Sequence, residues 1–294
     1  MKNGTAKGYL FAVISAVMYG CMPLMAKHIY ADGVNPISLV FLRNVFSLLP
    51  LGILAYRQSK TLKIPAKQLP SIALISVLGC CVTPILLFSS YRFMDSGTAT
   101  VFHFVYPAIV VVLELIFMRK KTRLGSLVSV LLCVLGIAMF YSPQQALSLT
   151  GSCLALASGL TFSLYVVLLA HFKVPTISGF LLAFYIAAIS SIATLLICLA
   201  TNSLVFPATL PGWGLCVLFS LLITTGAVTL FQQSAFLIGS ERVSILSTLE
   251  PITSVVIGII VFQEPLSIRV AIGSALVVLA SILIAFTDLK NRKK

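Results

Sequence analysis

Charged residues are scarce in this chain of 294 residues. Asp, Glu, Lys and Arg together make up 9% of it, only 7 residues are acidic, and hydrophobic residues make up 59%. A soluble domain carries about 25% charged residues, because its surface must face water. The chain has too little polar surface for that, and its mean hydropathy of +1.10 is typical of a protein that spans a membrane several times.

Several motifs of catalytic and metal-binding sites are absent from the sequence. It has no Gly-rich loop with a Lys for nucleotide phosphates, no clustered His and Glu set suited to a metal, and no nucleophile elbow. The 7 cysteines fall in apolar stretches and show no paired metal-ligand spacing, so we expect them to pack as small hydrophobic residues. We therefore expect no enzyme and no resident cofactor or metal.

Ten apolar stretches have about the length needed to cross a membrane. A spanning helix needs about 20 apolar residues, and short connections separate the stretches. Because backbone in hydrocarbon must satisfy its own hydrogen bonds, such stretches predict an all-α polytopic bundle rather than a barrel. The first stretch has no signal-peptide cleavage site, so we expect it to be retained as a span. The stretches are residues 8–27, 37–56, 71–93, 97–117, 124–141, 151–170, 178–200, 213–237, 243–262 and 268–287.

Most of the 20 Lys and Arg residues lie in alternate connections, on one side of a membrane crossed ten times. The other side holds only Lys27, Arg92 and Arg269, while Arg43 lies within a span. Cytoplasmic loops carry the excess of Lys and Arg, so we predict a multi-pass protein of an inner or plasma membrane with both termini cytoplasmic. The net charge of +13 is then a consequence of topology and does not indicate nucleic-acid binding.

The chain contains an internal repeat. Sliding it by 144 residues places Pro107 on Pro251 and Ser90 on Ser234, with no gap between residues 74 and 140. Each half holds five stretches, an odd number, so the second copy must enter the membrane with the opposite orientation. We predict two inverted five-helix repeats, residues 1–142 and 143–294, an arrangement that many secondary transporters share.

The segment LEPITSVVIGIIVFQEPLS, residues 249–267, resembles the ninth span and following turn of EamA-type transporters of the drug/metabolite transporter superfamily. Gln263 stands where that turn usually has Gly, and the first-half counterpart, residues 118–122, lacks the Glu. The resemblance extends over the whole chain. It implies an inverted-repeat carrier, usually an exporter of amino acids or related metabolites, and it leaves the substrate open.

Arg43 is the candidate that membrane energetics single out most clearly. It lies about six residues into the second stretch, roughly 9 Å deep at 1.5 Å per residue. An Arg at mid-span costs about 2.5–3.5 kcal/mol on insertion scales, so it needs a partner or water. It either anchors a substrate carboxylate or serves a structural role, by snorkelling or by ion pairing.

Glu250 lies about seven residues inside the ninth stretch and is either a cation or proton site or a packing carboxylate. Arg43 and Glu250 enter from opposite faces of a core about 30 Å thick. We expect roughly 10 Å between their backbones along the membrane normal, which does not ensure a direct ion pair.

Pro107 and Pro251 are predicted to kink the fourth and ninth spans, because proline leaves the carbonyl four residues earlier without its usual partner. The kinks serve gating or helix packing. Under the repeat, His103 maps to Ser247 and Tyr106 maps to Glu250, so equivalent positions carry different chemistry. His103 could titrate near neutral pH or be a hydrogen-bonded structural residue.

We predict a transporter that moves a small polar metabolite by alternating access, most simply an amino-acid exporter with possible proton coupling. The alternatives are an importer or exchanger, or a protein that handles lipids or acts as a scaffold in the bilayer. The residues predicted to line the substrate site are Arg43, His103, Tyr106, Glu250, Tyr19, Tyr91, Tyr165 and Gln232. The tyrosines and Gln232 could instead be membrane-interface or packing residues.

Overall fold

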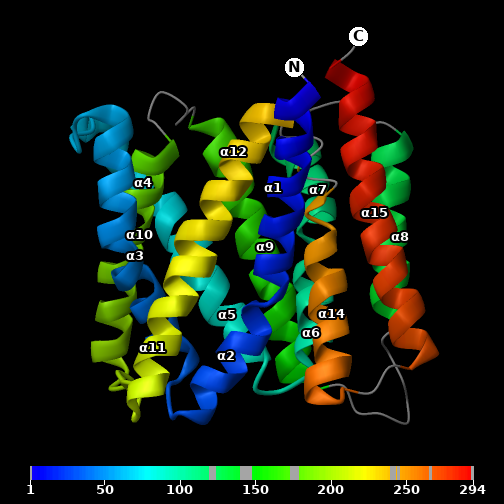
Figure 1. The fold of residues 1–294 in the computed structure, drawn as a ribbon. Helices are drawn as coiled ribbons and strands as arrows, with labels where there is room; N and C mark the ends of the chain where they lie inside the picture. Colours follow the sequence, from blue (N-terminus) through cyan, green and yellow to red (C-terminus); the bar gives the residue numbers. More distant parts are fainter. Residues whose placement is uncertain are drawn as a thin grey trace.

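The computed structural model describes residues 2–118, 124–139, 148–172, 179–238, 243, 246–264 and 267–292. Within these ranges the chain forms helices joined by turns and contains no strand (Figure 1). The helices are α1 (Lys2–Gly20), α2 (Met22–Ala31), α3 (Pro36–Ser59), α4 (Leu69–Ser76), α5 (Thr83–Ser90), α6 (Ser96–His103), α7 (Tyr106–Met118), α8 (Leu124–Met139), α9 (Leu149–His171), α10 (Gly179–Ala200), α11 (Leu210–Phe219), α12 (Val228–Ile238), α14 (Leu249–Phe262) and α15 (Ile268–Arg292).

Helical runs in the described part of the chain fall on all the predicted stretches. In it, 7 runs are long and apolar enough to cross a membrane, which confirms a helical protein with several membrane spans. Three shorter apolar helices occupy the remaining stretches, so the count of ten spans stays a prediction. The long runs are Thr5–Ala31, Pro36–Ser59, Ala66–Ser90, Ser96–Leu113, Leu149–Leu169, Gly179–Ala200 and Leu210–Phe231, and the short helices are Leu127–Met139, Leu249–Phe262 and Ile268–Leu283.

Local sequence fixes the ends of α3, the helix that carries Arg43. Asn35 caps its N-terminus by accepting a hydrogen bond from the Ser38 N–H, and Pro36 occupies the first turn, where a missing N–H costs nothing. At the other end, Lys60 adopts a left-handed conformation with φ 56° and stops the helix.

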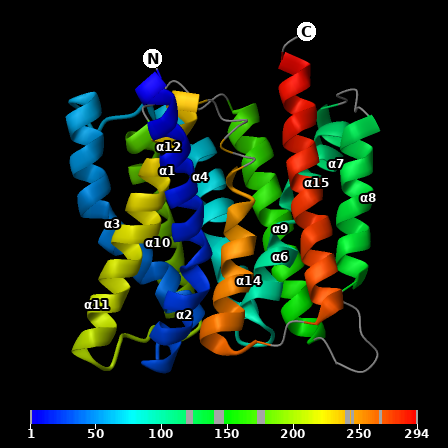
Figure 2. The same cartoon turned by 45° about the vertical axis from the view of Figure 1, so that its right-hand side comes forward.

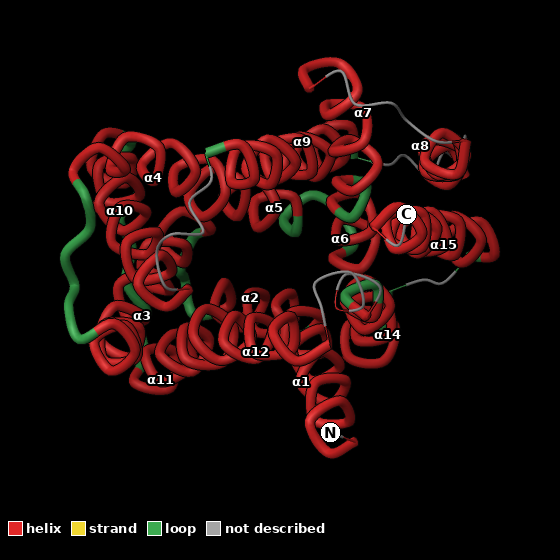
Figure 3. Tube along the Cα trace, turned by 90° about the horizontal axis from the view of Figure 1, so that it is seen from above, coloured by secondary structure: helices red, strands yellow, loops and turns green. Residues whose placement is uncertain are grey.

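The helices pack as a flattened bundle whose main pairs join the two halves of the chain. The most extensive contacts are between α3 and α10, α8 and α15, α1 and α12, and α5 and α9. Seen from above, α3 and α10 lie at one end and α8 and α15 at the other, with α11, α12 and α1 along one long side and α5 and α9 along the opposite side (Figure 3).

Individual contacts follow the offset of the internal repeat. A Cβ built on Gly8 of α1 would lie 2.5 Å from the Ile238 side chain at the end of α12. A Cβ on Gly151 of α9 would lie 3.1 Å from the Met94 side chain just after α5. Gly151 and Met94 are the repeat partners of Gly8 and Ile238, so the same close approach between the two halves occurs twice.

Two π-helical turns also recur at equivalent positions, and the sequence pattern did not predict them. Residues 77–82 separate α4 from α5, and residues 220–227 separate α11 from α12. A π turn shifts the backbone register, and such turns occur frequently at functional sites. In the first of them, the side chain of Asn44 donates to the Cys80 carbonyl at 3.3 Å, which ties the turn to α3.

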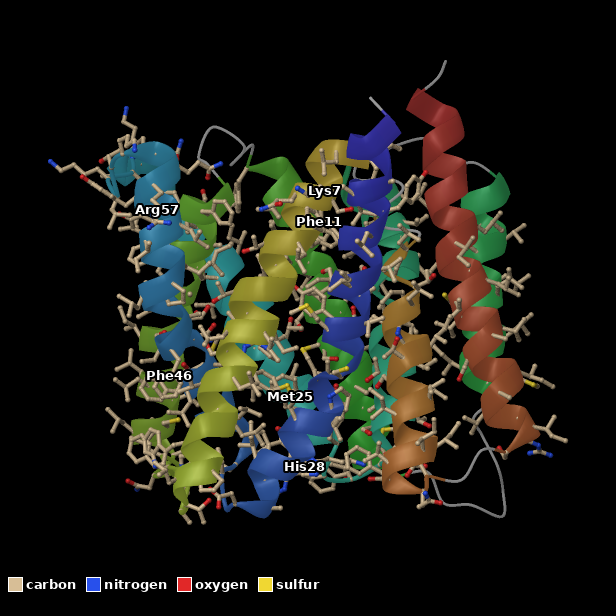
Figure 4. All side chains as sticks on the ribbon, in the orientation of Figure 1. Lys7, Phe11, Met25, His28, Phe46 and Arg57 are labelled. Atoms are coloured by element: carbon tan, nitrogen blue, oxygen red, sulfur yellow. The ribbon has the colours of Figure 1, made fainter. Side chains whose placement is uncertain are left out.

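Both chain termini lie at the same end of the bundle (Figures 1 and 2). Lys7 and Arg57 lie toward that end, whereas His28 lies at the opposite end, called here the far end (Figure 4). This placement fits the alternation of basic residues in the sequence, and the assignment of the terminus end to the cytoplasm remains a prediction.

Candidate functional site

Arg43 lies inside the bundle without an anionic partner among the described residues. Its Nε atom is buried and has no hydrogen-bond partner there, and the guanidinium carbon lies 5.6 Å from the centre of the Phe88 ring. Its backbone carbonyl accepts a hydrogen bond from the Ser220 hydroxyl at 2.6 Å. The backbone is therefore held in place by the second half of the chain while the cationic group is left available.

Tyr19 and Tyr91, two of the predicted site residues, lie within electrostatic range of this guanidinium. Tyr19 lies within electrostatic range of Arg43, Glu250 and Tyr165. Tyr91 lies within range of Arg43 and Glu250. The helices concerned, α1, α3, α9 and α14, lie on different sides of the bundle (Figure 3), so the cluster is a property of the tertiary fold.

Glu250 is the second residue of α14. The close packing of α1 on α14 depends on Gly20, where an added Cβ would lie 2.8 Å from the Glu250 carbonyl. The carboxylate has no hydrogen bond or ion pair among the described residues, whose one salt bridge joins Lys27 to Glu264. Arg43 and Glu250 therefore form no ion pair among the described residues, although each lies within electrostatic range of Tyr19 and Tyr91.

His103 is buried and held by Ser158 of α9. The Ser158 hydroxyl donates to the Ala155 carbonyl at 2.6 Å, so its single proton is used. It must then accept from the Nδ1–H of His103, 2.9 Å away, which leaves Nε2 without that proton when the ring is neutral. The structure thus gives His103 a hydrogen-bonded partner in α9 within a buried environment.

An aromatic row connects His103 to the rest of the cluster. The Tyr106 ring lies 5.8 Å from the His103 ring and 4.7 Å from the Phe162 ring. The Phe162 ring in turn lies 5.4 Å from Tyr165. Tyr165 packs against the backbone of Gly79, where any Cβ would overlap its ring. The row therefore ends on the first π turn.

The two prolines stand in the first turns of new helices. The fourth stretch breaks at residues 104–105, and Pro107 follows at the start of α7. The His103 carbonyl closely approaches Gly159 of α9, where a Cβ would be 2.9 Å away, so it faces a neighbouring helix. Pro251 is the third residue of α14, and the Ser247 carbonyl, expected to lack a partner, accepts from the Glu250 N–H at 3.0 Å.

Gln232 belongs to α12, but its side chain lies outside the described residues. A groove on the described surface lies away from the Arg43 cluster, along the outer side of α3. Its lining residues are Leu48, Leu49, Gly52, Ile53, Tyr56 and Arg57.

A second polar cluster, at the far end, was not predicted as a site. Lys27 of α2 donates to Glu264 Oε1 at 2.6 Å, and Ser96 donates to the same oxygen from its N–H at 3.0 Å and its hydroxyl at 2.8 Å. The Gly97 N–H donates to Oε2 at 3.3 Å. Burial alone would raise the pKa of Glu264, but donation from Lys27 and Ser96 lowers that pKa below its usual value. Burial and the nearby Glu264 carboxylate raise the pKa of Asp95.

An all-helical bundle with several membrane spans and an unpaired cation, a carboxylate and phenols gathered between its halves has the features of a membrane transporter. The chain belongs to the EamA-like transporter family, whose model matches residues 6–142 and again residues 149–286. The residue-level resemblance to EamA-type transporters is therefore confirmed. The family assignment indicates a multi-pass membrane transporter of small molecules rather than an enzyme.

Related proteins agree with this assignment. An uncharacterized transporter of Clostridium kluyveri is 20% identical over 289 residues, which cover 94% of this chain and 92% of the relative. An uncharacterized inner membrane transporter of Salmonella typhimurium, YicL, is 24% identical, with 99% of each chain covered. A solved crystal structure superposes with a TM-score of 0.64 at 16% identity, covering 95% of this chain and 98% of that one, which shows a shared fold.

Proposed function

We propose that the chain is a secondary transporter that exports a small metabolite bearing a carboxylate, an amino acid or a close relative, by alternating access. One observation carries this proposal: Arg43 lies within the span formed by α3, and its Nε atom is buried and unpartnered among the described residues. A buried cation is costly unless it is paired. A substrate carboxylate would supply the missing anion and accept two parallel hydrogen bonds from the planar guanidinium.

Glu250 supplies the second half of the recognition. The Glu250 carboxylate and the Arg43 guanidinium both lie within electrostatic range of Tyr19 and Tyr91. They form no ion pair with each other among the described residues. Two opposite charges that share neighbours without pairing suit a zwitterion. Its carboxylate would bind Arg43, and its ammonium would bind Glu250. In the alternate conformation Glu250 would take a proton instead, which makes coupling to a proton gradient part of the proposal.

The repeat supports alternating access. We propose ten spans in two inverted five-helix repeats, residues 1–142 and 143–294, with both termini cytoplasmic in the cell membrane. The paired contacts of Gly8 and Gly151, and the two matched π turns, support a common architecture for the halves. Binding residues come from both, so rocking one half against the other would expose the cluster to each side in turn. Pro107 and Pro251, each at the start of a helix, would act as the gating points.

The proposal is tested by comparing the metabolites in the medium of cells that express the wild type or Arg43→Ala at equal membrane levels. A compound that accumulates outside only with the wild type would establish export and identify the substrate class. The matched control is Arg92→Ala, which removes an exposed arginine and should leave export intact. If the medium is the same with and without the protein, export is wrong, and import or lipid handling becomes the better explanation.

A further inference from the structure

The far-end cluster joins three elements from the two halves of the chain. Lys27 belongs to α2, Ser96 and Gly97 begin α6, and Glu264 follows α14. Helix α14 packs on both α2 and α6, and the three lie together at the end away from the termini (Figures 1 and 2). These four residues are called here the latch, because their contacts cross from one half to the other.

The chain around Glu264 is shaped to place its carboxylate there. Gln263 ends α14 in a left-handed conformation with φ 54°, and the Glu264 N–H turns back to donate to the Gly258 carbonyl at 3.0 Å. The carboxylate folds over Gly258, where any Cβ would collide with it. The Glu264 side chain is only 9% exposed, and the Lys27 ammonium also lies 4.1 Å from the centre of the Phe262 ring. The ion pair is thus partly shielded from water, since the Lys27 side chain is 23% exposed, and it is reinforced by the hydrogen bonds from Ser96 and Gly97.

A continuous line of hydrogen bonds leads from the latch toward Arg43. The Thr100 hydroxyl donates to the Ser96 carbonyl at 2.9 Å and accepts from Ser254 of α14 at 3.0 Å. Tyr91 lies 3.4 Å from the same hydroxyl and within electrostatic range of Arg43. Thr100 has one proton to donate and two lone pairs to accept with, so it can make all three contacts. Hydrogen bonds therefore connect the latch at the far end to Tyr91, a predicted residue of the substrate site.

The sequence repeat does not carry the charges of this ion pair into its other copy. The sequence counterparts of Lys27 and Glu264 under the repeat are Ala170 and Lys120. Ala170 carries no charge, and Lys120 carries the charge opposite to that of Glu264. These two positions therefore cannot form the same ion pair. The latch is therefore a feature of one copy of the repeat and not of both.

We propose that the latch is the gate of the far end and holds the resting transporter closed on that side, with the substrate site facing the termini. This inference rests on the proposed function, because only an alternating-access carrier needs such a gate. It adds a resting orientation suited to loading substrate from the cytoplasm. Opening toward the far side requires that Lys27 and Ser96 release Glu264.

Cys80 provides a native reporter for the test. It lies within electrostatic range of Arg43 and is partly exposed. Labelling with a membrane-impermeant maleimide, in right-side-out and in inverted vesicles, reports from which side the site is reached. Fragment-ion mass spectrometry locates the label on Cys80 rather than on the adjacent Cys81, and Cys80→Ala gives the background.

Two variants weaken the latch in different ways. Lys27→Ala removes the cation but leaves Glu264 on the N-terminus of α6, while Glu264→Gln removes the negative charge and keeps the shape. We expect both to raise far-side labelling of Cys80 roughly tenfold, since a hydrogen bond to a charged group is lost. Arg92→Gln, which neutralises an exposed arginine outside the latch, should label at the wild-type rate.

Unchanged far-side labelling in both variants, with the fold intact by thermal unfolding, would overturn the gate. Faster labelling of the wild type from the far side than from the terminus side would overturn the proposed resting orientation. Labelling does not require transport, so its outcome is independent of the export test. If Arg43→Ala exports normally while Cys80 labelling still depends on the latch, the proposed substrate site is wrong and the proposed gate stands.

Discussion

At the scale of single residues, Arg43 connects membrane energetics to function. Replacing it with Ala removes a buried charge that costs about 2.5–3.5 kcal/mol at mid-span, so we expect the apparent melting temperature in detergent to stay the same or rise. Transport should nevertheless be abolished, because the substrate carboxylate loses its anchor. A variant that loses stability and transport together would instead indicate a structural arginine.

Glu250 provides an independent prediction at the same scale. Glu250→Gln keeps the size of the side chain and removes its ability to ionise. We expect the protein to reach the membrane at wild-type levels and to lose transport, since the ammonium or proton has no carboxylate to meet. Flux equal to that of the wild type at every pH tested would exclude Glu250 from the pathway.

Acid should act on the protein through Glu264. A carboxyl group whose folded pKa lies below its unfolded value of about 4.3 stabilises the fold above that value, and the contribution is lost as pH falls through the lowered pKa. The Glu264 pKa is lowered in this way, so the latch should persist at pH 5 and above. In thermal unfolding between about pH 3 and 5, we expect the wild type to lose stability more steeply than Glu264→Gln. Parallel curves of stability against pH for the two proteins would show that the contacts with Lys27 and Ser96 do not lower the Glu264 pKa.

At the scale of helices, the apolar stretches predicted where helices lie but not where they are interrupted. Composition reports which residues prefer lipid, and all the stretches contain helix in the described ranges. It says nothing of backbone register, so the break at Cys21 between α1 and α2 and the two π turns were missed. The break before Pro107 was predicted only as a kink, because the sequence shows the missing N–H and not how far the chain departs from a helix.

The first π turn gives a prediction about packing. Gly79→Ala would place a methyl group inside the Tyr165 ring, and overpacking of this kind costs about 1–3 kcal/mol. We expect a lower melting temperature and impaired transport, because Tyr165 is displaced from the aromatic row. Gly214→Ala is the matched control, since no heavy atom lies within 4 Å of its Cβ position. Equal effects of the two substitutions would mean that the Tyr165 contact is unimportant.

At the scale of the whole molecule, tertiary structure determines which predicted residues belong together. Arg43, Tyr19, Tyr91 and Glu250 were named from the sequence, and the fold places the two tyrosines within electrostatic range of both charged residues. The latch could not be found this way, because Lys27 and Glu264 are 237 positions apart and Ser96 and Glu264 are 168 apart. A charge in a short connection looks like an ordinary loop residue until the fold supplies its partner.

The topology makes a prediction of its own. Fusions after the C-terminus should be active for a reporter that works in the cytoplasm and inactive for one that requires export, because basic residues gather at that end. A fusion placed in the connection between α10 and α11 should give the opposite result. The same result at both positions would contradict the inverted arrangement of the halves.

The most direct measurement of the central claim is efflux from proteoliposomes loaded with a mixture of carbon-13-labelled amino acids. The wild type should release one amino acid or a small related group, Arg43→Ala should release none above protein-free vesicles, and Arg43→Lys should release less than the wild type because Lys lacks the paired donors. Equal release by the wild type and Arg43→Ala would contradict the assignment of Arg43 as the carboxylate anchor.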